Sequence, residues 1–238
     1  MFSFHPDKFD FWPVYDCIKR FYPLGIPRGS LYKDYAGFKE AVALWESEIV
    51  NADRCEARWA PFVNEVTLGL GKPVFGRTYG QAPCYSIAVE LERKVLENIT
   101  RIRELQCFVS ILGPFYTVIG IDRNEIQTGE RHPVRSTNYM VVSPQHEYED
   151  SFRKLCDIVE DRFKGYRFVP YRICTTAIEG LRVWYMDEDE PGNRIFHALF
   201  TYQIDFNIQT LGAETYGADA WIKEGYVQKG SWVANPPL

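Results

Sequence analysis

Apolar and polar residues alternate most regularly between residues 194 and 210. The apolar positions of this stretch are Phe196, Ala198, Phe200, Tyr202, Ile204, Phe206 and Ile208. Because successive side chains of a strand point to opposite faces, this period of two predicts one long strand, or two strands that meet at a bend. We expect one face of this strand to be buried and the other to be polar, and we take it as the centre of the fold.

The first part of the chain carries apolar residues at helical spacing. A stripe at every third or fourth position predicts a helix from Tyr32 to Asn51. Shorter patterns predict helices over Pro13–Phe21 and Arg54–Trp59, the second of which ends before Pro61 because the residue before a proline disfavours helical angles. Repeated glycines then predict a long loop or lid over residues 69–83.

Residues 86–104 predict a further amphipathic helix, although alternating apolar residues at its start are also compatible with a strand. Two apolar runs follow, over 105–112 and 115–121, and Gly113-Pro114 between them predicts a buried hairpin. Residues 136–142 predict a third strand.

The remaining elements are predicted mainly by capping and turn residues. Ser143-Pro144 predicts the start of a helix, and Gly165 predicts its end. Residues 166–174 and 181–186 predict two further strands, and a short helix is expected near 213–223.

These elements predict an α+β fold. Strands joined by short turns favour antiparallel pairing, so we expect a sheet of about six strands in the C-terminal half, with helices packed on one face and a helical N-terminal half. The 238 residues are expected to form a single domain, 1–238, with a helical lobe over about 1–104 and a β-rich lobe over about 105–238.

The distribution of charge narrows the possible partners. The net charge is −5, and residues 1–104 are neutral, so residues 105–238 supply all of it. No basic stripe suited to a phosphate backbone is present, which argues against nucleic acid as a partner. An acidic C-terminal half is better suited to a basic protein partner.

Other features of the sequence concern location and cofactors. The N-terminus lacks a basic segment followed by an apolar run, and no apolar window reaches the roughly 18 residues of a membrane span, so we expect no signal peptide and no membrane insertion. The six cysteines are scattered, with no C-x-x-C pair, which predicts reduced thiols and a cytoplasmic location. No metal site and no cofactor are predicted.

No catalytic motif is present. The glycine-rich loop departs from a phosphate-binding loop, because Val66 stands at its first glycine position and Pro73 at its final Ser/Thr position. His197 and Asp205 lie on the same face of the predicted strand, but at ~3.3 Å per residue they would be ~26 Å apart, too far for a catalytic pair. The catalytic residues, if the chain is an enzyme, are therefore unknown.

Our principal hypothesis is a non-enzymatic, immunity-type inhibitor that neutralises a basic toxin or effector by direct binding. Aromatic residues beside carboxylates on one predicted hairpin are suited to an interface core with an acidic rim. The candidate partner-binding residues are Trp184, Tyr185, Asp187, Glu188, Asp189 and Glu190.

The alternative hypothesis is a small-molecule-binding domain or an enzyme. Its site would lie on the polar face of the 194–210 strand, at His197, Thr201 and Gln203, and would be closed by the loop over 69–83. A concave pocket lined by these side chains would favour this alternative. A third possibility, a structural subunit of a larger assembly, would show as a large exposed apolar patch.

Overall fold

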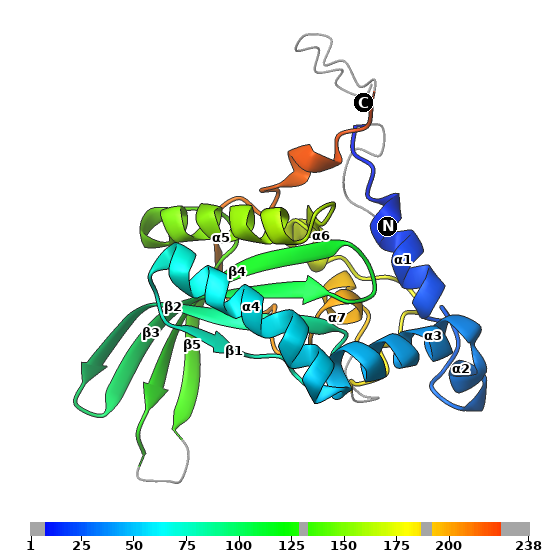
Figure 1. Cartoon of the computed structure of the whole chain (residues 1–238), viewed down its shortest axis with the longest axis horizontal. Helices are drawn as coiled ribbons and strands as arrows, with labels where there is room; N and C mark the ends of the chain where they lie inside the picture. The colour runs from blue at the N-terminus through cyan, green and yellow to red at the C-terminus, as the bar shows by residue number, and fades with distance from the viewer. Residues whose placement is uncertain (1–7, 129–132, 187–191, 225–238) are drawn as a thin grey trace, which may run out of the picture.

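The computed structural model describes residues 8–128, 133–186 and 192–224, and Figure 1 shows their arrangement. The α-helices are α1 (Trp12–Phe21), α2 (Ser30–Asp34), α3 (Ala36–Trp45), α4 (Ala52–Leu70), α5 (Glu149–Arg162), α6 (Tyr171–Cys174) and α7 (Ile195–Leu199). Shorter turns are the π-helical η1 (Glu46–Val50) and the 3-10 helices η2 (His146–Tyr148) and η3 (Ala218–Trp221). The strands are β1 (Val74–Gly76), β2 (Cys84–Leu96), β3 (Ile99–Ser110), β4 (Phe115–Ile126), β5 (Val134–Val141), β6 (Arg167–Phe168) and β7 (Thr210–Leu211).

The strands of the described residues form one sheet in the order β1-β2-β3-β4-β5-β7, and β6 pairs with β4. The pairs from β1 to β5 are antiparallel, whereas the two short strands β6 and β7 add in parallel. The predicted α+β class is therefore confirmed, with helices before the sheet and a mainly antiparallel sheet after them. The division into lobes within one domain stays a prediction.

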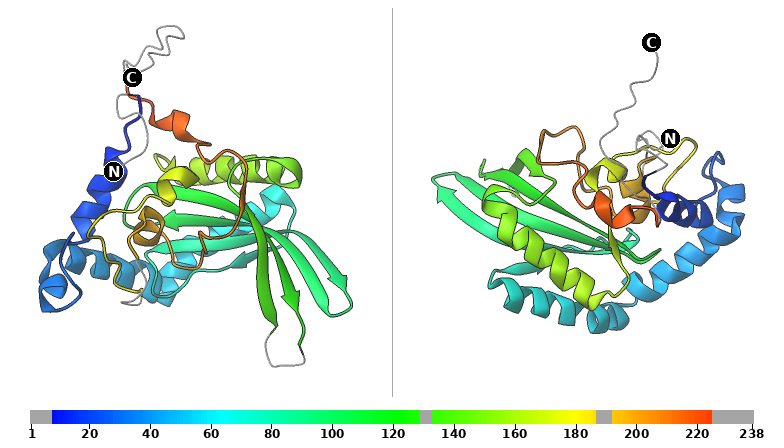
Figure 2. Two further views of the ribbon diagram at one scale, coloured as in Figure 1. Left: turned by 180° about the vertical axis from the view of Figure 1, so that it is seen from behind. Right: turned by 90° about the horizontal axis from the view of Figure 1, so that it is seen from above.

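The sheet separates two hydrophobic cores (Figure 2). On one face, which we call the helix face, α4 and α5 pack on residues such as Val89, Leu105 and Val118. On the opposite face, which we call the loop face, α1, α7 and the segment over 201–209 pack on Phe108, Ile119 and other residues. Both faces of the central sheet are therefore covered.

The predicted strand over 194–210 is wrong. Residues 195–199 form helix α7, an irregular segment follows, and only Thr210–Leu211 are a strand. All five residues of α7 are buried, including His197 on the expected polar face. Phe196 and Phe200 are four residues apart, and their rings pack at 5.4 Å in this helical turn, so the alternating pattern concealed a second, helical spacing.

The predicted helix over 86–104 is also wrong, because this segment is the β2–β3 hairpin. Its turn lies at Glu97 and Asn98, and Glu97 has a positive φ of 45°. A single strand of that length would be unusual, which favours a helix over one strand. Two strands joined by a turn remove this difficulty, and Asn98, a common turn residue, was the signal for them.

The helices before the sheet differ from the prediction in their boundaries. The predicted helix 32–51 is split into α2, α3 and η1, with extended backbone at Tyr35 between α2 and α3. The predicted helix 54–59 is the much longer α4, which contains Pro61 and is capped by Asn51, whose side chain accepts a hydrogen bond from the Arg54 N–H. Helix α4 and strand β1 therefore occupy part of the predicted loop 69–83.

The remaining predicted elements are confirmed where the structure has a long helix or strand, and they are shortened or wrong elsewhere. The hairpin of 105–112 and 115–121, the strand near 136–142 and the helices α1 and α5 are confirmed, with small shifts of their ends. The predicted strand 166–174 is reduced to the two residues of β6 followed by α6, and 181–186 is not a strand. The helix expected near 213–223 is the four-residue η3.

Candidate functional site

Four strands of the sheet continue past the covering helices and form a projecting arm (Figure 1). We define the arm as residues 90–96 of β2, 99–104 of β3, 122–126 of β4 and 134–139 of β5. Exposure along these strands increases toward the end of the arm, for example from buried residues at the start of β2 to exposed residues at its end. The arm therefore offers two faces and a free end that the body of the protein leaves accessible.

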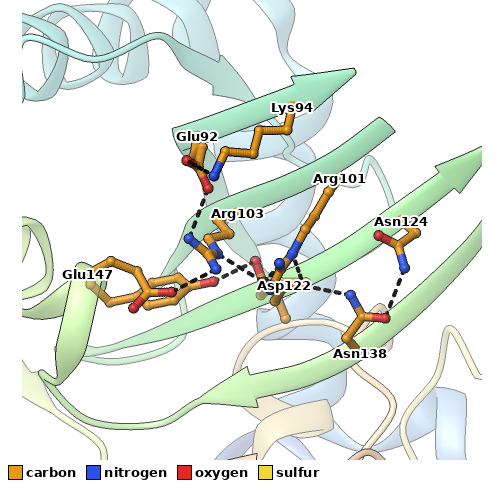
Figure 3. A network of polar contacts seen from close by, with 10 residues as sticks. Glu92, Lys94, Arg101, Arg103, Asp122, Asn124, Asn138 and Glu147 are labelled. Carbon is orange, nitrogen blue, oxygen red and sulfur yellow. Dashed lines mark hydrogen bonds and ion pairs between the residues drawn. The ribbon is translucent and has the colours of Figure 1, made fainter. Parts of the chain in front are cut away.

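A buried carboxylate organises the helix face of the arm (Figure 3). The Asp122 side chain is fully buried and pairs with Arg101 at 2.7 Å and with Arg103 at 3.0 Å. The side-chain amide of Asn138 donates a third hydrogen bond to the Asp122 carboxylate, at 2.6 Å. Asp122 thereby links β3, β4 and β5 through side chains as well as through the backbone.

Further carboxylates pair with Arg103 in this cluster. Arg103 pairs with Glu92 of β2 at 2.9 Å and with Glu147 of η2 at 3.2 Å, and Glu92 also pairs with Lys94 at 2.8 Å. The contact with Glu147 attaches the arm to the beginning of the α5 segment. Because Asp122 and Arg103 are largely desolvated and multiply bonded, this network holds the strands more firmly than exposed ion pairs would.

The surroundings of Asp122 hold it in the charged form. Burial raises the pKa of its carboxyl, but the hydrogen bonds from Arg101, Asn138 and Arg103 outweigh burial and lower the pKa to about 2. The hydrogen bond to Asp122 in turn raises the pKa of the Arg101 guanidinium. The central pair therefore stays ionised across the physiological pH range.

We expect acid to weaken the fold through Asp122. Its folded pKa of about 2 is below the unfolded value of about 3.9, so its contribution to stability is complete above pH ~4 and is lost as the pH falls through about 2. Urea unfolding of the wild type and of Asp122→Asn at a series of pH values measures this contribution. The difference in unfolding free energy should shrink between pH ~4 and pH ~2, and a difference that is independent of pH would contradict the assignment.

A second charged cluster lies on the loop face of the arm. Glu104 and Arg123 are both almost buried, and their side chains pair at 3.3 Å. Arg123 also pairs with Glu125, which accepts a further bond from Arg135 at 3.2 Å, while Gln106 donates to Glu104 at 2.6 Å. This cluster forms part of the wall of a cavity of about 420 Å³.

The free end of the arm carries an apolar row. The strand register places Leu96 opposite Ile99, Ile99 opposite Ile126, and Ile126 opposite Val134. These four side chains therefore lie side by side across all four strands, on the helix face. Leu96 is 63% exposed, Val134 is 49% exposed and Ile99 is 37% exposed. We call these four residues the apolar row.

The structure describes two of the six candidate partner-binding residues, Trp184 and Tyr185. The Trp184 ring is half-buried and stacks on Tyr22, with the ring centroids 5.7 Å apart. Tyr185 donates a hydrogen bond from its hydroxyl to the carbonyl of His197. Both aromatic residues thus pack against the loop-face core, and neither lies in a strand of the described residues. Asp187, Glu188, Asp189 and Glu190 lie outside the described residues.

The alternative ligand residues are not brought together on one polar face. His197 and Thr201 are buried, and only Gln203 lines the 420 Å³ cavity. Burial, and secondarily the charge of Arg194, lower the pKa of His197 to about 4, so its imidazole is neutral at pH 7. Its Nδ1 atom has no hydrogen-bond partner within the described part of the chain.

Three findings concern metal ligands, thiols and membrane spans in the described ranges. Within them, no three histidine, cysteine, aspartate or glutamate side chains gather in a way that could hold a metal ion. All six cysteines are free thiols. No helix there is both long enough and apolar enough to cross a bilayer.

Comparison with known proteins gives no match to a family model, a curated protein or a solved structure. The arm and its two charged clusters must therefore be interpreted from their own chemistry.

Sequence reasoning missed the arm because it assigned β2 and part of β3 to a helix. A usable signal was present: Glu90, Glu92 and Lys94 alternate with other residues, and so do Arg101 and Arg103. Oppositely charged residues at strand spacing are typical of cross-strand pairs. The shared partner of Arg101 and Arg103, Asp122, lies about twenty residues later and could not be identified without the strand register.

Proposed function

We propose that this chain is a protein-binding protein that acts as an immunity-type inhibitor, and that its partner docks on the free end of the arm. The observation that carries this proposal is the apolar row, four aliphatic side chains presented together on a projecting surface. Scattered exposed apolar residues are ordinary, but a contiguous group at a projecting edge favours an interface.

The rigidity of the arm supports the same proposal. The Asp122 network cross-links the strands behind the apolar row, which favours an ordered row before a partner binds. A surface that is already ordered loses less conformational entropy on binding, which favours affinity.

Acidic and basic side chains are nearly balanced in the arm, so its charges favour specific pairing with a partner over long-range electrostatic attraction. The arm includes five acidic and six basic side chains. The acidic ones are Glu90, Glu92, Glu104, Asp122 and Glu125, and the basic ones are Arg93, Lys94, Arg101, Arg103, Arg123 and Arg135. The net charge of −5 on the whole chain is the feature that favours a basic partner, chiefly through faster association.

The direct test is titration of the purified chain against the product of the adjacent gene, measured by calorimetry. We expect a saturable complex that the double variant Leu96→Ser/Val134→Ser weakens at least ~10-fold, because the two most exposed apolar side chains of the row are removed. Leu96 and Val134 are exposed, so the variant should unfold within ~0.5 kcal/mol of the wild type.

The matched control is Leu68→Ser. Leu68 is 85% exposed on α4 and is not part of the arm, so its replacement removes a similar side chain without changing the apolar row. Its affinity should equal that of the wild type. The absence of any complex, or an equal loss of affinity in the control, would refute the proposal.

A further inference from the structure

A cavity of about 420 Å³ lies where the arm joins the body, on the loop face of the sheet. Its walls come from three separate parts of the chain: strands β3 to β5, Arg77 just after β1, and the segment over 203–208. The volume is within the range of small-molecule pockets, which is about 300–1,000 Å³. The lining includes Glu104, Arg123 and Arg135 of the loop-face charged cluster, but no residue of the apolar row.

The floor of this cavity is apolar. Ile121, Met140 and Ile204 line it and are each at most 5% exposed over the whole residue. The polar side chains around them include Gln106, Thr137 and Gln203. An apolar floor with a few converging polar groups is the usual composition of a ligand site.

Most charges of the cavity are already matched within the protein. Arg123 pairs with both Glu104 and Glu125, and Arg135 pairs with Glu125. Two cations therefore stand against two anions, and this cluster needs no ligand for neutrality.

Two charges at the edge of the cavity are not matched. Arg77 is exposed and has no carboxylate partner within the described part of the chain. The Asp205 carboxylate accepts bonds only from Asn207 there, from its backbone N–H at 2.9 Å and its side-chain amide at 3.0 Å. Both residues line the cavity, yet no ion pair joins them. One free cation and one free anion thus face the same space.

We propose that this cavity binds a free amino acid with an apolar side chain. The ligand carboxylate would pair with Arg77 and its ammonium group with Asp205, each as a charge-assisted hydrogen bond. The side chain of the ligand would lie over Ile121, Met140 and Ile204. This site does not depend on the protein partner, because Arg77 and Asp205 lie apart from the apolar row.

The test uses four probes, free L-leucine, L-isoleucine, L-methionine and L-phenylalanine, titrated separately at millimolar concentration into the full chain. Isothermal calorimetry should show saturable one-site binding for at least one of them. Analogues of the bound probe that lack one charge, its amide without the carboxylate and its N-acetyl form without the ammonium group, should each bind at least ~10-fold more weakly.

Variants then assign the two charges. Arg77→Gln and Asp205→Asn should each weaken binding at least ~10-fold, and both residues are exposed, so thermal unfolding should remain that of the wild type. The control Arg162→Gln removes an exposed arginine of α5 that pairs with Glu65, and it should bind like the wild type. Binding of none of the four probes, equal binding of the analogues, or unchanged affinity in both cavity variants would overturn the proposal.

Discussion

Replacement of Asp122 by alanine is expected to lower the free energy of unfolding by about 3 kcal/mol. The substitution leaves Arg101 and Arg103 without their shared carboxylate, and Arg103 is mostly buried, with 19% of its side chain exposed. Removing one member of a buried ion pair is costly because the remaining charge stays desolvated. Asn138 also loses the oxygen to which it donates at 2.6 Å.

Two measurements separate this effect from a general loss of stability. Urea unfolding gives the free energy of unfolding. Relative to the wild type, amide hydrogen exchange in Asp122→Ala should accelerate more in the arm than in the central sheet. The control Asp161→Ala removes a carboxylate that is 79% exposed and pairs with Lys164, so its cost should be below ~1 kcal/mol. Equal costs for the two variants would show that Asp122 does not organise the arm. If the proposed function holds, Asp122→Ala should also weaken partner binding, because the apolar row loses its rigid support.

Replacement of Gly37 by alanine is expected to cost about 3 kcal/mol, although alanine favours helices over glycine by about 1 kcal/mol. Gly37 lies in the first turn of α3, where that helix crosses α1. A Cβ atom there would overlap the backbone carbonyl oxygen of Arg20 and lie 2.8 Å from a ring carbon of Tyr35. Backbone cannot move aside as a side chain can, so α1 and α3 would have to separate.

The control for this variant is Gly69→Ala in helix α4. A Cβ atom at Gly69 would meet only the side chain of Ile158. The Cδ1 atom of Ile158, at the flexible end of that side chain, would lie 2.7 Å away. Helix propensity and a small rotamer shift oppose each other there, so the free energy of unfolding should change by less than ~1 kcal/mol. Thermal or urea unfolding of both variants decides the matter. A stabilised Gly37→Ala protein would show that the α1–α3 contact adjusts easily.

The two proposals place two binding functions in different parts of the arm. The apolar row at the free end is the docking surface for a protein, whereas the cavity at the base has the charges for a small zwitterion. Both depend on the same architecture, in which the strands are cross-linked by ion pairs on each face. The serine variants of the apolar row and the Arg77 and Asp205 variants therefore test independent statements.

The sequence by itself determined the elements in which turn or cap residues delimit a clear apolar pattern. The hairpin over 105–121 has continuous apolar runs broken by Gly113-Pro114, and α5 has an apolar stripe between a Ser-Pro start and Gly165. A short continuous apolar run bounded by Gly-Pro favours a buried strand, whereas a longer stripe at helical spacing between cap residues favours a helix. The α+β class followed from these elements and is confirmed.

Only the tertiary structure decided the conformation of residues 195–199 and the pairing of charges that are distant in the sequence. Residues 195–199 are buried on all sides, so their alternating pattern no longer distinguished a strand from a helical turn. In the arm, Arg101 and Arg103 find Asp122 through the register of β3 with β4. Periodicity measures which residues leave water, but strand pairing selects which of them meet, and that selection depends on the whole fold.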